Sequence, residues 1–200
     1  MMELRDTNIQ RDSMRFRRNL ERFGELIAYE ISKELEYEEI DVKTSLGNAK
    51  CNILAEQPVI ACILRAGLPM HQGVLNYFDQ AENSFISAYR KHSTAENFEI
   101  EIEYLSSPRI EEKTLILCDP MLATGSSMVL AYKAMLSKGT PKHIHIAAII
   151  ASSEGVEYAK KHLPENTTFW IGAIDDELTA QSYIVPGLGD AGDLAYGVKE

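Results

Sequence analysis

The chain has 200 residues, which is enough for one full-sized domain with its own core and short for two. Apolar residues make up 45%, an ordinary globular value, and the net charge of −10 disfavours nucleic-acid binding, because a polyanion requires a basic surface. The composition therefore predicts a single globular domain over residues 1–200 whose default partner is not a nucleic acid.

The chain has three cysteines, Cys51, Cys62 and Cys118, and no two of them are close in sequence. Cys62 and Cys118 lie in apolar strand patterns, so we expect buried, reduced thiols and a cytoplasmic location. Residues 1–6 do not have the pattern of a signal peptide, and the apolar run 146–151 is far too short to span a bilayer.

The first predicted element is an amphipathic helix over residues 12–35, because apolar residues recur there every three or four positions. Its other face carries a quarter of all the lysines and arginines in the chain. This cluster has two interpretations: a solvated face paired with glutamates, or a site for an anionic effector or a second subunit. The cluster consists of Arg11, Arg15, Arg17, Arg18 and Arg22. A β-hairpin is predicted next, over residues 42–54, with Gly47 and Asn48 at its tip.

Two predicted strands each end in an arginine. Residues 58–64 form a continuous apolar run, typical of a strand buried on both faces, and Arg65 follows it. Residues 84–89 form a second strand, followed by Arg90. Two permanently charged, bidentate side chains suit a diphosphate, although an ordinary surface ion pair is the alternative for Arg65. Residues 97–104 then alternate strictly between apolar residues and glutamate, which predicts a half-exposed strand in an arm or flap outside the core sheet.

Residues 114–136 combine a strand, an acidic residue, a turn of small residues and a helix. The small residues are Ala-Thr-Gly-Ser-Ser at 123–127, and Asp119 lies where the strand ends. Backbone N–H groups of such a turn, with the helix N-terminus, bind phosphate, and a nearby carboxylate suits sugar hydroxyls. The segment lacks Gly-Lys-Ser/Thr, so it is not a Walker P-loop.

Residues 143–151 and 167–172 supply two more buried strands, with a helix over 153–162 between them. Five core strands that alternate with helices predict a parallel sheet covered on both faces. Ligands of such sheets bind outside the carboxyl ends of the strands, where Arg65, Arg90 and Asp119 fall. His143 and His145 share one strand face without a nearby acidic or thiol ligand, which favours a polar strand entrance over a metal site.

The C-terminal segment, residues 183–193, reads YIVPGLGDAGD. Its glycines match the dinucleotide pattern G-x-G-x-x-G, but only eight residues follow Gly192, too few for a βαβ unit. The glycine density instead indicates a loop whose backbone approaches a flat, polar ligand closely.

Four segments resemble, in order, the signature segments of uracil phosphoribosyltransferases, which are type I phosphoribosyltransferases that use phosphoribosyl diphosphate (PRPP). They are ILRAG at 63–67, AYR at 88–90, DPMLATGSS at 119–127 and the C-terminal segment YIVPGLGDAGD. The resemblance extends from about residue 5 to residue 198. It implies an α/β domain with a central parallel sheet of about five strands flanked by helices, a β-arm or flap, and a C-terminal hood that binds the base.

The resemblance also implies a reaction, in which uracil and PRPP give UMP and pyrophosphate with Mg²⁺ as cofactor. It implies a homodimer or larger homo-oligomer, with GTP as a possible effector. The implied PRPP-binding residues are Arg65, Arg90, Asp119, Pro120, Met121, Leu122, Ala123, Thr124, Gly125, Ser126, Ser127 and Asp190. The implied uracil-binding residues are Ile184, Gly189, Asp190 and Ala191.

Asp190 and Asp193 are similar in sequence and have different predicted roles. Asp190 is the catalytic candidate, since it is the one nearby candidate base for the uracil N1 proton, although a carboxylate is a weak base and orientation matters more. Asp193 lies at the exit of the loop, where it could hold the Mg²⁺ shell through water or merely cap the final turn.

The sequence departs from the family pattern in four places: a shorter N-terminus, a flap two residues longer, Ser106 in place of a lysine and Ser126 in place of a glycine. The first three departures concern the flap and the response to GTP rather than the reaction, whereas Ser126 keeps the N–H donor and adds a Cβ, so a positive φ there would be strained. A regulatory RNA-binding protein and a purine phosphoribosyltransferase are the alternatives, but the net charge disfavours the first and the compact glycine-rich loop the second.

Overall fold

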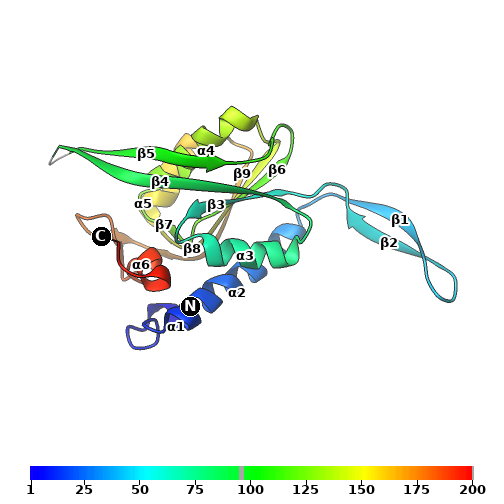
Figure 1. The fold of residues 1–200 in the computed structure, drawn as a ribbon, viewed down its shortest axis with the longest axis horizontal. Helices are drawn as coiled ribbons and strands as arrows, with labels where there is room; N and C mark the ends of the chain where they lie inside the picture. Colours follow the sequence, from blue (N-terminus) through cyan, green and yellow to red (C-terminus); the bar gives the residue numbers. More distant parts are fainter. Residues whose placement is uncertain (95–96, 200) are drawn as a thin grey trace.

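The computed structural model describes residues 1–94 and 97–199, except for the side chains of residues 88–102. Its centre is a mixed sheet in the order β5-β4-β3-β6-β8-β7, with β9 beside β8 (Figure 1). The strands are β3 (Val59–Leu64), β4 (Glu82–Thr94), β5 (Asn97–Ser106), β6 (Thr114–Cys118), β7 (Met121–Leu122), β8 (His143–Ser152) and β9 (Thr167–Asp175).

The five predicted core strands form a parallel sheet, which confirms the expected fold class. Parallel pairing joins β4 to β3, β3 to β6, β6 to β8 and β8 to β9. Nearly every side chain of β3 and all those of β6 are buried, because the sheet is covered on both faces. Cys62 of β3 lies opposite Cys118 in the parallel pairing of β3 with β6, so the carboxyl ends of these two strands meet at one edge of the sheet.

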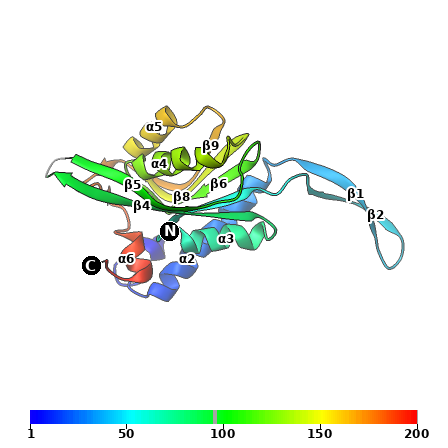
Figure 2. The same cartoon turned by 45° about the horizontal axis from the view of Figure 1, so that its top comes forward.

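Helices cover both faces of the sheet, as Figure 2 shows. The helices α2 (Ser13–Ser32) and α3 (Leu68–Tyr77) lie on one face, and α4 (Ser126–Met135) and α5 (Ser153–His162) lie on the other. Three short helices are α1 (Met2–Arg5), the 3₁₀ helix η1 (Leu136–Lys138) and α6 (Ala191–Tyr196).

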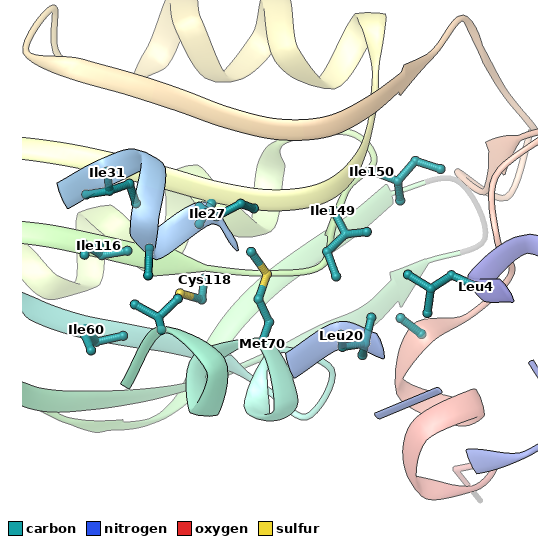
Figure 3. Close-up of a cluster of buried hydrophobic side chains, with 14 of the residues drawn as sticks. Leu4, Leu20, Ile27, Ile31, Ile60, Met70, Ile116, Cys118, Ile149 and Ile150 are labelled. Atoms are coloured by element: carbon teal, nitrogen blue, oxygen red, sulfur yellow. The ribbon is translucent and has the colours of Figure 1, made fainter. Parts of the chain in front are cut away.

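The predicted apolar stripe of α2 packs on the sheet. Leu20, Ile27 and Ile31 are buried together with Ile60 and Ile116 of the strands (Figure 3). Each such side chain contributes about 1.5–3 kcal/mol when fully buried, so the packing of this face, more than helix propensity, stabilises α2. The helix ends at Ser32, three residues earlier than the prediction.

The arginines of α2 have mixed surroundings. Arg15 pairs with Glu3 at 3.4 Å and Arg18 with Glu21 at 2.6 Å, both at the surface, as the interpretation with glutamate partners expects. Arg17 differs, because its Nη1 donates to the Ala195 carbonyl at 2.6 Å and so joins α2 to α6. This contact links the N-terminal and C-terminal parts of the chain.

Two β-ribbons extend from the body of the molecule (Figure 1). The hairpin of β1 (Tyr37–Lys43) and β2 (Asn48–Leu54) confirms the predicted hairpin, but its first strand begins five residues earlier than expected. The second ribbon is formed by β4 and β5, which pair antiparallel. The predicted arm strand, residues 97–104, lies almost wholly beyond the part of β4 that pairs with β3, as expected, and Leu105 and Ser106 continue β5 to the edge of the core sheet opposite Ile86 and Phe85.

The structure also shows where the three cysteines and the two histidines of β8 lie. Cys62 and Cys118 are buried free thiols, and Cys51 is exposed. His143 and His145 lie on one face of β8 with ring centroids 4.5 Å apart, and the Trp170 indole donates to His145 Nδ1 at 3.0 Å. Among the described residues, no helix combines the length and the apolar character that crossing a bilayer requires.

Candidate functional site

The carboxyl ends of β3 and β6 lead into a cavity of about 450 Å³. Arg65 follows β3 and Asp119 follows β6, and both line the cavity. The segment before α4 and the C-terminal segment form its other walls. The predicted site residues on the lining are Arg65, Asp119, Met121, Leu122, Ala123, Thr124, Gly125, Ser127, Asp190 and Ala191.

Other predicted site residues lie behind this lining. The carbonyl of Pro120 accepts from the backbone N–H groups of Ile149 and Ile150, at 3.1 and 3.0 Å, so Pro120 is part of the sheet edge. Ile184 is buried in the hydrophobic core, with only its backbone available to a ligand. The other predicted residues off the lining are Ser126, Gly189 and Asp193, and the side chain of Arg90 lies outside the described residues.

Residues 119–127 form a compact turn, called here the phosphate loop, between β6 and α4. Gly125 caps α4 with φ +76°, and a Cβ there would lie 2.7 Å from the Gly155 carbonyl oxygen. Only glycine fits this backbone and this contact. Gly125, the N-cap of α4, has no side chain to cap the helix, and the N–H of Ser126 donates to Thr124 Oγ1 at 3.4 Å. The N–H groups that follow in the first turn of α4 are the ones that can bind an anion beside the cavity.

Ser126, a departure from the expected family pattern, is accommodated without strain. It is the first residue of α4, and its φ is not positive. Its hydroxyl accepts a hydrogen bond from Thr124 Oγ1 at 3.1 Å. The serine therefore adds a hydroxyl to the phosphate loop and leaves the backbone N–H groups where a glycine would place them.

Asp119 is the most perturbed carboxyl group of the cavity. Burial raises the pKa of Asp119 to about 7, and the negative charge of Asp190 acts in the same direction. The backbone N–H of Met121 donates to Asp119 Oδ1 at 3.2 Å, which opposes the rise in pKa. A carboxylate in this position gains from a ligand that supplies hydroxyl donors or a cation.

The opposite wall is the hood, residues 183–197. Asp190 begins α6 as its N-cap, and Asp190 Oδ1 accepts from the Asp193 N–H at 2.9 Å. Gly187 has φ +61°, and a Cβ there would lie 2.0 Å from the Ile184 carbonyl oxygen. The three glycines thus shape a tight loop followed by a six-residue helix, and the dinucleotide pattern is a coincidence, as the sequence predicts.

An ion pair between Arg5 and Asp175, which the sequence analysis did not predict, attaches the hood to the rest of the molecule. Arg5 contacts Asp175 through two hydrogen bonds of 2.7 and 2.8 Å, which lower the pKa of Asp175. Asp175 Oδ2 also accepts from the Gly187 N–H at 2.8 Å. Arg5 Nη1 donates to the Gly187 carbonyl at 3.3 Å. Both polar backbone groups of Gly187 are therefore held by residues more than ten positions away.

A second ion pair joins the hood to the end of β3. Arg65 Nη2 donates to Asp193 Oδ1 at 3.1 Å and to the Gly197 carbonyl at 3.0 Å. The alternative sequence interpretation of Arg65 was an ordinary surface ion pair; the pair that forms is partly buried and joins this cavity-lining arginine to Asp193, which lies off the lining. Further lining residues that the sequence analysis missed are Gln181, Ser182 and Lys199, which lie in no recognisable motif.

The donor set of the cavity suits a hard cation. Asp119 and Asp190 both line it, and carboxylate oxygens are ligands that Mg²⁺ prefers. Among the described residues, no group of three or more His, Cys, Asp or Glu side chains gathers at ligand distance. The residues therefore fit a Mg²⁺ ion that takes most of its ligands from phosphate oxygens and water, as this ion commonly does.

Comparison with known proteins decides the family. The family model described as "Uracil phosphoribosyltransferase" matches residues 1–198. The chain belongs to the uracil phosphoribosyltransferase family. Curated relatives with this name include one from Porphyromonas gingivalis, 61% identical over all of this chain and 92% of the relative. Another, from Thermococcus gammatolerans, is 38% identical over 98% of this chain and 87% of the relative.

Solved structures are similar in fold. A protein of Aquifex aeolicus is 32% identical and has a TM-score of 0.87, with 98% of this chain and 93% of that one covered. A hypoxanthine phosphoribosyltransferase from Staphylococcus aureus has a TM-score of 0.54 at 12% identity, over 81% of this chain and 76% of that one. The second likeness concerns the fold alone, a parallel sheet flanked by helices that the uracil family shares with other phosphoribosyltransferases.

Proposed function

We propose that the chain, as one phosphoribosyltransferase domain over residues 1–200, transfers the phosphoribosyl group of PRPP to uracil and forms UMP and pyrophosphate. The observation that carries the proposal is the single cavity that joins the phosphate loop, Asp119, Arg65 and the hood. Family membership supports the reaction, and the cavity supplies a separate wall for each part of the two substrates.

The phosphate end of PRPP is bound by the loop and α4. The 5′-phosphate accepts from the backbone N–H groups and hydroxyls of residues 123–127, beside the N-terminus of α4. The ribose hydroxyls donate hydrogen bonds to Asp119. These bonds stabilise its ionised form, which burial disfavours by removing it from water. Arg65 holds the diphosphate, and Arg90 is proposed for the same role from its sequence position.

The hood reads the base. Backbone groups of Ile184, Gly189 and Ala191 accept from and donate to the alternating polar groups of uracil. Asp190 lies between base and ribose, and since its Oδ1 caps α6, its Oδ2 remains for the substrate. Asp190 orients the base by accepting a hydrogen bond from uracil N1–H, and its carboxylate is the group that takes this proton as the bond from N1 to ribose C1 forms.

The bond to pyrophosphate breaks through an oxocarbenium-like state at ribose C1. Arg65 lowers the barrier by neutralising the leaving diphosphate, and the protein walls keep water away from the reactive carbon. Asp119 and Asp190 would lie beside a Mg²⁺ ion bound together with PRPP, and that ion would supply charge neutralisation. The earlier hypothesis that Asp193 holds the Mg²⁺ shell stays a prediction, and its carboxylate is engaged with Arg65.

Three further features follow from the family resemblance and stay predictions: a homo-oligomeric state, activation by GTP and a cytoplasmic location. Light scattering, and assays with and without GTP, test the first two. The buried free thiols Cys62 and Cys118 support the third, because a reducing compartment preserves them.

A pyrophosphate-release assay with PRPP and a panel of free bases tests the proposal. We expect turnover of uracil and at least about 10⁴-fold lower kcat/KM for cytosine, hypoxanthine and guanine, because fixed backbone groups reject a ring with reversed donors and acceptors. Comparable turnover of cytosine or of a purine would contradict the proposed function.

A further inference from the structure

The guanidinium of Arg65 is held on one side by the C-terminal segment. Its Nη2 atom carries two N–H groups, and its two acceptors are Asp193 Oδ1 and the Gly197 carbonyl, at 3.1 and 3.0 Å. Both acceptors lie more than 120 positions away in sequence, on α6 and just after it. The planar group therefore has a defined orientation and not the freedom of a surface arginine.

The rest of the same guanidinium is available to a ligand. The Nε atom of Arg65 is buried and has no hydrogen-bond partner among the described residues, while Arg65 lines the cavity. A buried donor without a partner is unfavourable, so Nε makes the ligand-free arrangement of Arg65 more costly. Both edges of a guanidinium that carry two parallel N–H groups include Nη2, so with both Nη2 hydrogens held, Nη1 is the nitrogen left to donate to a diphosphate oxygen.

Asp193 is itself held in place. Its N–H donates to Asp190 Oδ1 at 2.9 Å in the first turn of α6. Ala191 and Ala195 of that helix are buried in the core, and Arg17 of α2 donates to the Ala195 carbonyl. The carboxylate that contacts Arg65 thus stands on a helix that is packed and hydrogen-bonded from two sides.

We propose that Asp193 and the Gly197 carbonyl form a clamp that orients Arg65 for diphosphate, so that Asp193 is a positioning residue for PRPP binding. The inference rests on the proposed function, since it names what orients the diphosphate-binding arginine of that reaction. It also ties the two substrate sites together. Asp190, beside the base, caps the helix whose Asp193 holds Arg65, so ordering of the hood by uracil favours the clamp.

Two other roles of Asp193 make different predictions. A ligand of the Mg²⁺ shell would change the Mg²⁺ concentration that gives half-maximal rate when it is removed. A residue that only stabilises α6 would lower thermal stability and affect uracil and PRPP alike. The clamp predicts a change in PRPP and pyrophosphate affinity alone, and only while Arg65 is present.

The test is calorimetric titration of PRPP and of pyrophosphate at saturating Mg²⁺. It compares wild type, Asp193→Ala, Asp193→Asn, Arg65→Ala and the double variant Arg65→Ala/Asp193→Ala. We expect Asp193→Ala to weaken both ligands about 10-fold, the loss typical of one charged hydrogen bond. Asp193→Asn, which keeps an oxygen acceptor, should lose less. In the Arg65→Ala background the second substitution should have no further effect.

The control is Asp79→Asn, which removes the same charge from an exposed position between α3 and β4. It should bind PRPP like wild type. Uracil turnover and the Mg²⁺ titration are measured on the same samples, and thermal unfolding shows that each variant is folded.

Equal losses from Asp193→Ala with and without Arg65 would overturn the clamp, as would a shifted Mg²⁺ midpoint with unchanged PRPP affinity. Wild-type PRPP affinity in both Asp193 variants would overturn it too. In each of these cases the proposed function would still hold, provided that the wild-type protein turns over uracil. A wild-type protein that fails to bind PRPP and to turn over uracil would overturn both.

Discussion

The phosphate loop and the hood face each other across the cavity and are built in different ways. The phosphate loop, residues 119–127, connects a buried strand directly to a helix, and its main-chain contacts are to β8 and α5 beside it. The hood, residues 183–197, has only two residues in a strand and a six-residue helix. Side chains of Arg5, Asp175 and Arg65, from three distant segments, hold it in place.

Because of this difference, we expect the phosphate loop to be the rigid wall of the site and the hood to be the wall that moves more easily. A turn between a buried strand and a packed helix has fixed N–H groups, which suits the phosphate that every turnover presents in the same form. The loop of the hood has little regular secondary structure beyond its buried residues, so it opens at lower free energy than the sheet, which suits a wall that must admit and release a base. We expect substitutions in the phosphate loop to affect folding and PRPP, and those of Arg5 and Asp175, the anchors at Gly187, to affect uracil.

The largest contrast concerns Asp119 and Asp175. Burial raises the pKa of Asp119 from 3.8 to about 7, so its contribution to the free energy of unfolding falls as pH rises through that range. The pKa of Asp175 is lowered by Arg5, so its contribution is present above the unfolded-state pKa and is lost as pH falls. At pH 8, Asp119→Asn should stabilise the protein by up to about 4 kcal/mol, and Asp175→Asn should destabilise it.

Chemical denaturation at pH 5 and pH 8 checks this pair. The gain from Asp119→Asn should be smaller at pH 5, because the buried carboxyl is then mostly protonated. Asp119→Asn should nevertheless lose PRPP binding. A loss of stability at pH 8 in both variants would remove the proposed difference between the two aspartates.

The next effect concerns Gly125 in the phosphate loop. Gly125→Val places a branched side chain at φ +76° and 2.7 Å from a backbone oxygen, which should cost about 3 kcal/mol of unfolding free energy and abolish PRPP binding. Gly47→Val, in the projecting hairpin, is the matched control, since nothing lies within 4 Å of its Cβ. It should change stability by less than about 0.5 kcal/mol. Equal costs at both glycines would show that the loop tolerates a side chain.

The smallest expected effect concerns Arg5, which tests how the hood is held in place. Arg5→Ala removes the partner of Asp175 and one hydrogen bond to Gly187, so the hood loses its anchor. We expect KM for uracil to rise about 10-fold, with KM for PRPP unchanged. Arg15→Ala, which removes an exposed arginine paired with Glu3 at 3.4 Å, is the control and should leave both KM values as they are. A rise in KM for PRPP of the same size would assign Arg5 to general folding.

The sequence predicted the sheet and the phosphate loop better than the contacts that hold the hood. The five parallel strands, the helices between them and the placement of Arg65 and Asp119 were predictable, because hydrophobic periodicity and strand ends are local signals. The phosphate loop was predictable for the same reason. Its one uncertain residue, Ser126, needed the structure to show that α4 begins there with an ordinary φ.

The rest depends on contacts between distant segments. Nothing near Arg5 indicates that it holds Gly187, 182 positions away, and nothing near Asp193 indicates Arg65. The arm was predicted, but not that β5 continues past it to the edge of the core sheet, because alternation predicts a half-exposed strand without naming its partner. The first strand of the hairpin was shortened in the prediction, since Tyr37–Lys43 buries almost nothing and so has a weak apolar pattern.

The most direct test of the central claim is product analysis with uracil and PRPP as the only organic substrates. Radiolabelled uracil is incubated with PRPP and Mg²⁺, and UMP and pyrophosphate are quantified from the same samples over time. The account predicts that the two products form in a ratio of about one to one and that neither forms when uracil or PRPP is omitted. Release of pyrophosphate without labelled UMP, or no conversion of uracil at any PRPP concentration, would contradict it.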